Sequence, residues 1–560
     1  MQNFSRKIRN KGFLIIAGFI FLSYGFINTS SNRDFQIARN MDIFFSMIRE
    51  INLFYVDDPN PEKLIENAIN GVLEGLDPYT TFIPESEKES YETMTTGRYG
   101  GIGALIRQRG DYVMISEPYE GFPAQTHGLK AGDVITAING TSLNGKPVGE
   151  VSDMLRGQSG STITLTIKRT GHDELLTKDI IRKEVKISNV AWYGKVADDI
   201  GYIQFNGFTE NAHQEVRHAL NDMKNNYNVS KLILDVRGNP GGLLMEAVNV
   251  TNLFVEKGQE IVSTKGKVTQ WDHTYRARNK PFDKEIPVVI LVGRSSASAA
   301  EIVAGAFQDL DRGVVIGQRT FGKGLIQTTR QLSYNSQLKI TTAKYYTPSG
   351  RCIQSVDFSE DNNYNKIPDS QINEFKTRNG RIVYDGGGII PDIHVYEETP
   401  APVVINLYAR NFIFDFATKY ASENPSIPAV SEFMINDDDY NNFLAFIEEA
   451  DFDYQTQTEI QVAQLLNAAK NEGYYDASES IFDELAKKIT HDKQRDLETH
   501  RDQIKSFLRE EIVSRYYYRN GRIEASIEGD PNLEKAIEIL NNQPLYEAIL
   551  KGAITHAGSL

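Results

Sequence analysis

Alternating strands and helices in the middle of the chain constrain its fold more than any other feature. From about residue 186, short apolar runs typical of strands alternate with runs of helical periodicity. Repeated β-α-β units of this length predict a largely parallel sheet with helices packed on it. The predicted strands are Tyr202–Phe205, Leu232–Val236, Val288–Val292 and Val314–Gly317, and the predicted helices are Thr209 (as N-cap) to about Asn225, Met245–Val255 and Ser298–Gln308.

Two regions of different texture precede these units. Residues 32–96 are predicted to be helical, and apolar side chains recur at helical spacing along Pro61–Leu76. Asp77-Pro78 is expected to end that helix, because a proline ring excludes helical geometry at the preceding residue. Residues 97–185 contain short β-like runs separated by turn signals, with one helix near Val148–Leu155. We therefore expect a small β-rich module there.

The chain becomes mostly helical again after about residue 400. The predicted helices are Val403–Ala421, Gln455–Lys470, Ser478–Lys488 and Leu533–Lys551. The sequence thus predicts a multidomain α/β protein, since 560 residues allow about three or four domains. The expected segments are an N-terminal basic and apolar segment (1–31), a helical region (32–96), the β-rich module (97–185), the α/β core (186–400) and a C-terminal helical region (401–560).

The composition argues against a nucleic-acid-binding protein and against sites built from several cysteines. The net charge is −15, and apart from one N-terminal cluster Lys and Arg are scattered, so no basic face for nucleic acid is expected. Cys352 is the single cysteine, which excludes an internal disulfide and a thiolate-based metal cluster. We expect no metal and no organic cofactor.

The N-terminus predicts export. Four basic residues between Arg6 and Lys11 precede an apolar run from Phe13 to Ile27, which has the length of a signal-peptide core and is short for a membrane span. No A-x-A cleavage site follows, so an uncleaved membrane anchor is also open. A buried helix of the folded core is the third alternative.

Residues Val288–Glu301, VVILVGRSSASAAE, are the strongest candidate for chemistry. An apolar strand ends in small residues and a helix begins, which places a side chain beside unpaired backbone N–H groups that favour negative charge. A tetrahedral oxyanion is one such charge. The alternative is structural, because Ser298-x-x-Glu301 is also a helix capping box. Ser295 and Ser296 are further candidates for the nucleophile.

A lysine between two glycines, in Thr320–Gln327 (TFGKGLIQ), is the second candidate. Lys323 can act as a base only when it is uncharged, and burial lowers the pKa of an amine. The apolar neighbours Phe321, Leu325 and Ile326 are consistent with such a pocket. A plain glycine turn or a phosphate-contacting loop is the alternative.

A glycine-rich turn, Arg237–Gly242, follows a predicted strand and would present free N–H groups to an oxyanion or to phosphate. No P-loop pattern accompanies it. No Ser-His-Asp triad is evident either, and His213, His218 and His273 are more typical of surface or internally satisfied histidines.

In their order and spacing, these motifs resemble the carboxyl-terminal processing peptidases, also called tail-specific proteases. In that family the second serine of SASAxE is the nucleophile, and a lysine base follows 25 positions later in TFGKGxxQ. Ser298 and Lys323 stand 25 positions apart here, and Gln327 matches the glutamine that supports the lysine. Ala300 departs from the serine often found there. The resemblance covers residues from about 40 to 396 and includes Leu76–Thr80, Tyr345–Gln354 and Gly388–Val395.

The resemblance implies a crotonase/ClpP-like catalytic core with an inserted PDZ domain. Gly100, Gly101, Ile102 and Gly103 match the loop whose amides receive a peptide carboxylate, while Leu129–Gly140 is similar to a typical PDZ run. Arg156 matches an arginine that links the PDZ domain to the active site in relatives, and a surface charge is its alternative. Glu301 is expected to be a helix cap rather than a catalytic group.

The resemblance therefore implies a serine endopeptidase of the periplasm or cell envelope that recognises C-terminal tails of exported proteins. Ser298 would attack, neutral Lys323 would take its proton, and N–H groups of Ala299 and of Gly241 or Gly242 would bind the oxyanion. An adaptor protein, a homodimer or higher oligomer and an inner-membrane anchor are compatible with it. The alternatives are an inactive PDZ scaffold and a crotonase-like acyl-transforming enzyme.

Overall fold

The computed structural model describes residues 33–358, 365–396 and 399–553. The predicted signal or anchor segment, Phe13–Ile27, lies outside these ranges. The chain forms two compact units, residues 1–82 and 83–560. Within the described ranges, no helix has both the length and the apolar character needed to cross a membrane.

The first unit is helical where it is described. A helix over residues 33–54 is followed by α2 (Pro61–Glu74), which Asn60 caps by accepting a hydrogen bond from Lys63 N. The carboxylate of Asp77 then accepts hydrogen bonds from the N–H groups of Tyr79 and Thr80. The helix thus ends before Asp77-Pro78, as the sequence predicts. The short strand β1 (Thr81–Ile83) spans the junction with the second unit.

A small antiparallel sheet forms the β-rich module. Its strand order is β3-β4-β5-β7-β8, with β6 paired to β5, so β3 is an edge strand. Helix α5 supplies Val151 and Leu155 to the module's core. The strands are β3 (Ala104–Arg109), β4 (Tyr112–Pro118), β5 (Val134–Ile138), β6 (Thr141–Ser142), β7 (Thr162–Lys168) and β8 (Leu176–Ile181); the helices are α4 (Pro123–Thr126) and α5 (Val148–Leu155).

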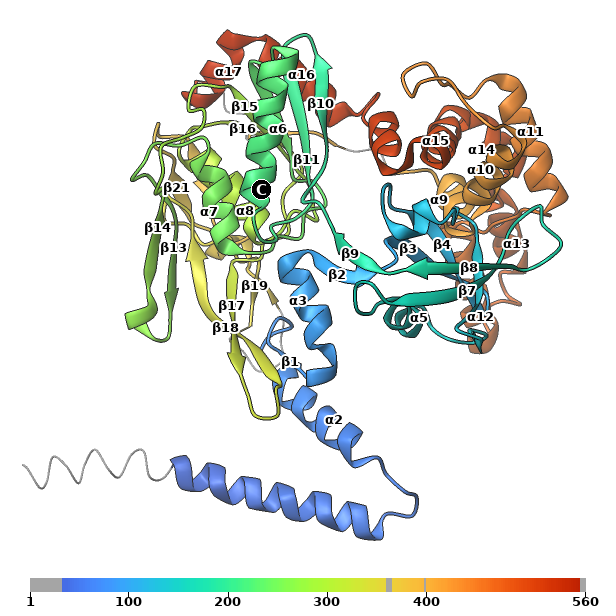
Figure 1. Ribbon diagram of the computed structural model, residues 1–560, viewed down its shortest axis with the longest axis horizontal. Coiled ribbons are helices and arrows are strands. Elements are labelled where there is room, and N and C mark those ends of the chain that lie inside the picture. The colour runs from blue at the N-terminus through green and yellow to red at the C-terminus, as the bar shows by residue number, and fades with distance from the viewer. Residues whose placement is uncertain (1–32, 359–364, 397–398, 554–560) are drawn as a thin grey trace, which may run out of the picture. The chain divides into compact units, whose positions relative to one another are not determined.

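Entry to and exit from this module run side by side. Strand β2 (Arg98–Gly101) precedes the module, strand β9 (Lys183–Lys186) follows it, and the two pair antiparallel (Figure 1). The module is therefore inserted through a two-stranded stem between α3 (Lys88–Thr96) and the next sheet.

The predicted parallel sheet is present, with one exception at its edge. The order is β10-β11-β12-β15-β16-β23, in which β10 is antiparallel to β11 and all other neighbours are parallel. The strands are β10 (Val190–Ala197), β11 (Ile200–Phe205), β12 (Lys231–Asp235), β15 (Val288–Val292), β16 (Val314–Gly317) and β23 (Ile393–His394). Figure 1 shows α6 and the neighbouring helices beside this sheet.

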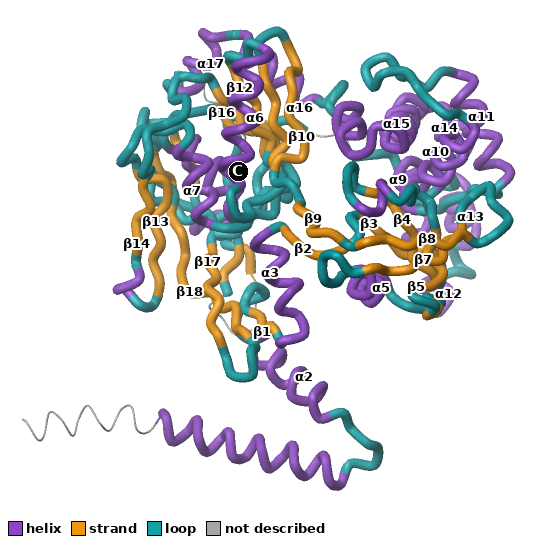
Figure 2. Tube along the Cα trace, in the orientation of Figure 1, coloured by secondary structure: helices purple, strands orange, loops and turns teal. Residues whose placement is uncertain are grey.

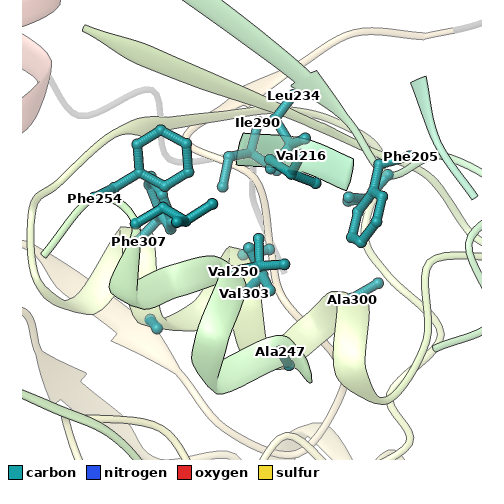
Figure 3. Packing of buried hydrophobic residues seen from close by; sticks show 14 of the residues in the cluster. Phe205, Val216, Leu234, Ala247, Val250, Phe254, Ile290, Ala300, Val303 and Phe307 are labelled. Carbon is teal, nitrogen blue, oxygen red and sulfur yellow. The ribbon is translucent and has the colours of Figure 1, made fainter. Parts of the chain in front are cut away.

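Both faces of this sheet are buried, which explains its uninterrupted apolar strands. Leu234 and Ile290 pack on α6 (Ala212–Tyr227), α7 (Leu244–Asn252) and α8 (Ala299–Asp309), as Figure 3 shows. The alternate residues Ile233 and Leu291 pack on the opposite face with α16 (Pro531–Asn541) and α17 (Gln543–Leu550). The sheet is thus the middle of three layers.

One predicted helix start is wrong. Helix α6 is preceded by Asn211 as its N-cap, whereas Thr209 donates hydrogen bonds from its N–H and its hydroxyl to Asn189 Oδ1. The left-handed backbone of Asn211, with φ of 66°, makes the entry into the helix, and asparagine tolerates that geometry. Thr209 instead anchors the preceding turn.

A second sheet carries part of the site. Strand β17 (Leu325–Gln331) pairs with β18 (Gln337–Tyr346), which pairs with β13 (Glu260–Gly266), which pairs with β14 (His273–Arg276), all antiparallel. Two short pairs follow in sequence: β19 (Val356–Asp357) with β20 (Asn365–Lys366), and β21 (Glu374–Lys376) with β22 (Ile382–Tyr384).

The C-terminal region is helical, as Figure 2 shows, and it packs in two places. Helices α9, α10, α11, α14 and α15 share a core of their own that includes Phe416, Phe443 and Leu508. Helices α16 and α17 pack instead on the large sheet. The remaining helices are α9 (Pro402–Ala409), α10 (Phe412–Glu423), α11 (Asp437–Glu449), α12 (Gln457–Glu472), α13 (Glu479–Ile489), α14 (Lys493–Thr499) and α15 (Arg501–Ser526).

Candidate active site

Ser298, Lys323 and Gln327 line one cavity of about 350 Å³. Segments that are far apart in sequence meet there: α3, the glycine turn before α7, the start of α8, and strands β17 and β18. The other lining residues are Tyr91, Met94, Thr95, Pro240, Gly241, Gly242, Leu243, Leu244, Ala299, Ile302, Leu325, Ile326, Lys339 and Tyr345. The cavity therefore combines apolar walls with a hydroxyl and amino groups.

Ser298 occupies a strained turn between β15 and α8. Its backbone has φ of 55° and ψ of −112°, a geometry that costs a non-glycine residue about 1–3 kcal/mol. Two contacts hold the turn: Ala297 N–H donates to Asn239 O at 3.0 Å, and Tyr345 OH donates to Ser298 O at 3.2 Å. Such strain is typical of a functional site.

The other two serine candidates are placed differently. Ser296 is fully buried, donates from its hydroxyl to Val236 O at 2.7 Å and accepts from Gly293 N–H, so its hydroxyl is used by the fold. Ser295 is exposed and is not among the residues that line the cavity. Of the three serines, only Ser298 lines the cavity that Lys323 also lines.

Glu301 joins the serine turn to the lysine loop. Its carboxylate accepts hydrogen bonds from Ser298 N–H at 2.8 Å and from Lys323 N–H at 2.9 Å through the same oxygen, Oε2. Its other oxygen accepts from Gly322 N–H at 2.7 Å and Thr320 Oγ1 at 2.5 Å. The bond from Ser298 N–H is part of the capping role that the sequence predicts, whereas the bonds to the lysine loop were not predicted.

The electrostatics of Glu301 reflect two opposing causes. The side chain is fully buried, and this burial holds its pKa above the usual value of a glutamate, although four hydrogen-bond donors oppose the rise. Four converging donors match an acceptor-only carboxylate, so we assign the ionised form. In that form one buried anion fixes the backbones of both catalytic candidates.

The glycines beside Lys323 permit close packing. A Cβ at Gly322 would lie 2.5 Å from Ser355 Cβ, and one at Gly324 would lie 2.8 Å from Gln354 N. Gly324 N–H donates to Gln354 Oε1, and Ser355 N–H donates to Gly322 O. The loop therefore lies directly against Gln354, which ends the predicted Tyr345–Gln354 motif, and against Ser355, which follows it.

The apolar surroundings predicted for Lys323 are only partly right. Leu325 and Ile326 line the cavity as expected, but the side chain of Phe321 is 51% exposed and lies outside it. The Phe321 N–H donates to Ser296 O at 3.0 Å, so its backbone lies against the serine turn. Lys323 itself is half-buried.

Gln327 lies on β17 just after an irregularity in the pairing with β18, between Ile326 and Gln327. The segment is thus not a straight strand. In a straight strand, the Cα atoms of Lys323 and Gln327 would be about 13 Å apart, so a contact between the two residues needs such a bend. Its side-chain amide donates to Thr341 Oγ1 at 3.1 Å. Support of Lys323 by Gln327 stays a prediction.

The glycine turn contacts the serine turn directly. A Cβ at Gly241 would lie 2.8 Å from Ser298 Cβ, and its φ of 98° also favours glycine. Gly241 N–H donates to Asn239 Oδ1 at 2.9 Å, so this donor is already engaged. Gly242 and Ala299 also line the cavity.

The predicted peptide-binding residues lie where β2 leads into edge strand β3. Gly100 and Gly101 belong to β2, and Gly103 has φ of 72°. A Cβ on Gly103 would lie 2.5 Å from Phe122 Cβ, so glycine is required for this close turn. Ile102 is buried in the module's core.

Arg156 ends α5 and contacts the helix that lines the cavity. Its Nη1 donates to Ser90 Oγ at 2.9 Å, and its guanidinium lies 5.5 Å from the Tyr99 ring centroid. Ser90 belongs to α3, whose Tyr91 and Met94 line the cavity. No sequence signal pointed to these α3 residues, because helical spacing alone does not tell what a helix packs against.

None of the three histidines lines this cavity. His213 pairs with Glu246 at 2.7 Å, His218 lies against the Tyr193 ring, and His273 lies against the Tyr275 ring. Within residues 33–358, 365–396 and 399–553, no histidine lines the cavity of Ser298 as a candidate base.

The chain is similar to known protease families along most of its length. Three family models match: a PDZ domain over residues 114–169, peptidase family S41 over residues 199–364, and the probable PDZ-protease C-terminal helical domain over residues 403–540. A carboxy-terminal-processing protease of Bartonella bacilliformis is 39% identical over 337 residues, which is 60% of this chain and 76% of that protein. The chain belongs to the carboxy-terminal-processing protease family. It is a serine-type peptidase with a PDZ domain and a C-terminal helical domain.

Further similarities accompany this assignment. A probable CtpA-like serine protease of Staphylococcus aureus is 34% identical over 351 residues, covering 62% of this chain and 70% of that protein. Among solved structures, a photosystem II D1 C-terminal processing protease is 28% identical and covers 64% of this chain and 87% of that chain, with a TM-score of 0.35.

Proposed function

We propose that this chain is an endopeptidase in which Ser298 is the nucleophile and Lys323, in its neutral form, is the general base. The single observation that carries the proposal is the buried carboxylate of Glu301, which accepts from the N–H of both residues. Both side chains line the same cavity, and no histidine of the described part of the chain does.

In the proposed reaction, Ser298 Oγ attacks the scissile carbonyl while its proton passes to Lys323 Nζ. The lysine then gives that proton to the leaving amine, and water hydrolyses the acyl-serine ester to restore the enzyme. Gln327 is proposed to orient the lysine, and no metal or organic cofactor takes part.

The oxyanion is proposed to be bound by the N–H groups of Ala299 and Gly242. Ala299 begins α8, where the helix has unpaired N–H groups and a partial positive charge. Gly242 is the better candidate of the two glycines, because Gly241 N–H donates to Asn239.

C-terminal tails are proposed to bind the PDZ domain as an added strand along β3, with their carboxylate at Gly100–Gly103. The position of β3 as the edge strand of its sheet supports this mode of binding. Arg156 and Ser90 then connect the PDZ domain to α3 and so to the cavity. The basic and apolar N-terminal segment supports the further proposal that the enzyme acts at the cell envelope.

The test is cleavage of an unfolded protein with a free C-terminus by wild type, Ser298→Ala and Lys323→Ala. Both variants are expected to lose at least about 10³-fold in rate, because nucleophile and base act as one unit. Ser295→Ala is the matched control and is expected to retain activity. Circular dichroism checks that each variant is folded.

Equal cleavage by wild type and Ser298→Ala would refute the assignment. Binding of the tail without cleavage by any variant would instead favour a PDZ scaffold.

A further inference from the structure

A second cavity, of about 830 Å³, is formed on the catalytic core by α6, α7 and the loop at 279–282. Its lining is rich in amides and includes two cations, and Leu253, Pro281 and Phe282 supply its apolar part. The lining residues are His213, Gln214, Arg217, His218, Asn221, Asn249, Asn252, Leu253, Asn279, Lys280, Pro281 and Phe282. It shares no residue with the cavity of Ser298.

The charge of this second cavity is opposite to that of the chain. Arg217 and Lys280 contribute cations, and none of its lining residues is Asp or Glu, although the chain carries a net charge of −15. The carboxylates next to the lining residues are engaged: Glu246 accepts from His213, Asp283 pairs with Lys224, Glu215 pairs with Lys186, and Asp222 accepts from Asn226. The local field therefore favours an anion.

The fold holds the polar groups of this cavity in place. Asn252 is buried, accepts from Arg278 N–H and Asn279 N–H at 3.0 and 2.9 Å, and donates to Asn279 O at 2.9 Å. These three bonds fix the loop that carries Lys280. A prearranged loop reduces the entropy lost when a ligand binds.

Two further lining residues are held in a similar way. Glu246 Oε2 accepts from both the N–H and Nδ1 of His213, at 2.9 and 2.7 Å, which fixes the imidazole and leaves Nε2 for another partner. The Arg217 guanidinium lies 5.4 Å from the centroid of the Phe282 ring. The cation is thus supported by an aromatic face.

We propose that this cavity is an exosite for an acidic segment of the polypeptide substrate, an inference that rests on the proposed peptidase function. Helix α7 connects it to the active site, since Leu244 at its start lines the first cavity and Asn252 at its end lines the second. Eight helical residues span about 12 Å. An extended chain covers that distance in about four residues.

The recognition chemistry follows from the lining. Carboxylates of the substrate pair with Arg217 and Lys280, whereas the asparagine amides offer both donors and acceptors to its backbone. The preferred substrates therefore carry Asp or Glu from about four residues away from the scissile bond.

The test uses paired fluorogenic peptides that end in the same C-terminal tail and differ only in having Glu or Gln at positions four to seven residues from the scissile bond, on either side. At low salt, wild type is expected to favour the Glu peptide by about tenfold in kcat/KM. The double variant Arg217→Glu/Lys280→Glu is expected to lose this preference and to cleave the Gln peptide as wild type does. Lys195→Glu/Lys488→Glu, with the same change in net charge at exposed positions, is the control and is expected to keep it.

Binding of the same two peptides to Ser298→Ala, measured by fluorescence anisotropy, separates the exosite from catalysis. The Glu peptide is expected to bind about tenfold more tightly, and adding Arg217→Glu/Lys280→Glu is expected to remove the difference. Equal binding of both peptides, or equal loss in the control variant, would overturn the exosite. Preferential binding without cleavage by wild type would leave the exosite intact and count against the proposed peptidase mechanism.

Discussion

The C-terminal region makes two contacts of opposite chemistry. Helices α16 and α17 pack on the large sheet through apolar side chains such as Leu533, Leu540 and Ile549. Helices α10 and α15 meet the PDZ domain through guanidinium groups instead. The PDZ residues Arg107, Arg109 and Glu117 contact Phe414, Asp415 and Arg522, respectively.

The contact between the PDZ domain and helices α10 and α15 is polar, and some of its buried hydrogen-bond donors have no partner. Phe414 lies under Arg107 on β3 and under Arg515 on α15, with centroid distances of 3.8 and 4.3 Å. Among the described residues, Arg107 Nε and Nη2, Arg515 Nε and Arg522 Nε are buried without a hydrogen-bond partner. A buried donor left unpaired costs about 1–3 kcal/mol, so this contact is the weaker one.

The difference indicates two roles for one region. An apolar layer stabilises the catalytic sheet permanently, because removing it would expose both helices and sheet to water. A charged contact can open at low cost, since separated charges regain water. Arg107 and Arg109 lie on β3, the strand along which we propose that tails bind.

The largest expected effect comes from Leu540, which is 1% exposed in the apolar contact. Leu540→Ala is expected to lower the free energy of unfolding by about 2–5 kcal/mol, because it leaves a cavity between helix and sheet. Urea unfolding followed by circular dichroism measures this. Glu538→Ala on the same helix is the exposed control, with a change within about 0.5 kcal/mol. Similar changes for the two variants would mean that α16 is not an essential layer.

The helical side of the charged contact is expected to respond to pH through Glu510 on α15, which interacts electrostatically with Arg522. Burial raises the pKa of Glu510 from 4.5 to about 7. A carboxyl whose folded pKa is raised holds its proton longer in the folded state, so its favourable contribution is complete below pH 4.5 and is lost as pH rises through 7. At pH 8 the ionised group opposes folding.

Glu510→Gln is therefore expected to raise the free energy of unfolding by about 2–3 kcal/mol at pH 8 and by much less at pH 5, as measured by urea unfolding. Glu524→Gln, at an exposed position of the same helix, is the control and should show no such dependence. An effect of Glu510→Gln that is the same at pH 5 and pH 8 would show that ionisation of Glu510 does not change the free energy of unfolding.

The smallest expected effect is that of the Arg109–Asp415 pair, which is bidentate at 2.6 and 2.8 Å but has side chains 38% and 32% exposed. A double-mutant cycle with Arg109→Ala and Asp415→Ala is expected to give a coupling of about 1 kcal/mol or less, falling at high salt. A coupling well above this, or one insensitive to salt, would make the PDZ contact as permanent as the apolar one.

Much of the fold could be predicted from the sequence. Val288–Val292 and Val314–Gly317 form strands with the predicted bounds, and Val148–Leu155 is a helix as expected. Local patterns suffice there because strand and helix periodicity are encoded within a few residues. The start of α6 was missed because a left-handed Asn211 and a distant partner, Asn189, decide it.

The residues of the candidate site could be predicted from the sequence, but their hydrogen-bond partners and their exposure to solvent could not. Motif spacing pointed to Ser298, Lys323 and Gln327, and the structure places all three in one cavity. The sequence could not show that Ser296 is used by the fold or that Phe321 faces water. The environments of Ser296 and Phe321 depend on which strands lie beside their turns in the folded protein.

The sequence by itself determined the family, the order of the secondary structure and the identities of the candidate nucleophile and base. The tertiary structure decided what holds them: one buried carboxylate, Glu301, between two loops, and α3 as a wall of the cavity. The physical reason is that hydrogen bonds and packing act over a few ångströms of space, whatever the separation along the chain. Only folding brings such partners within that range.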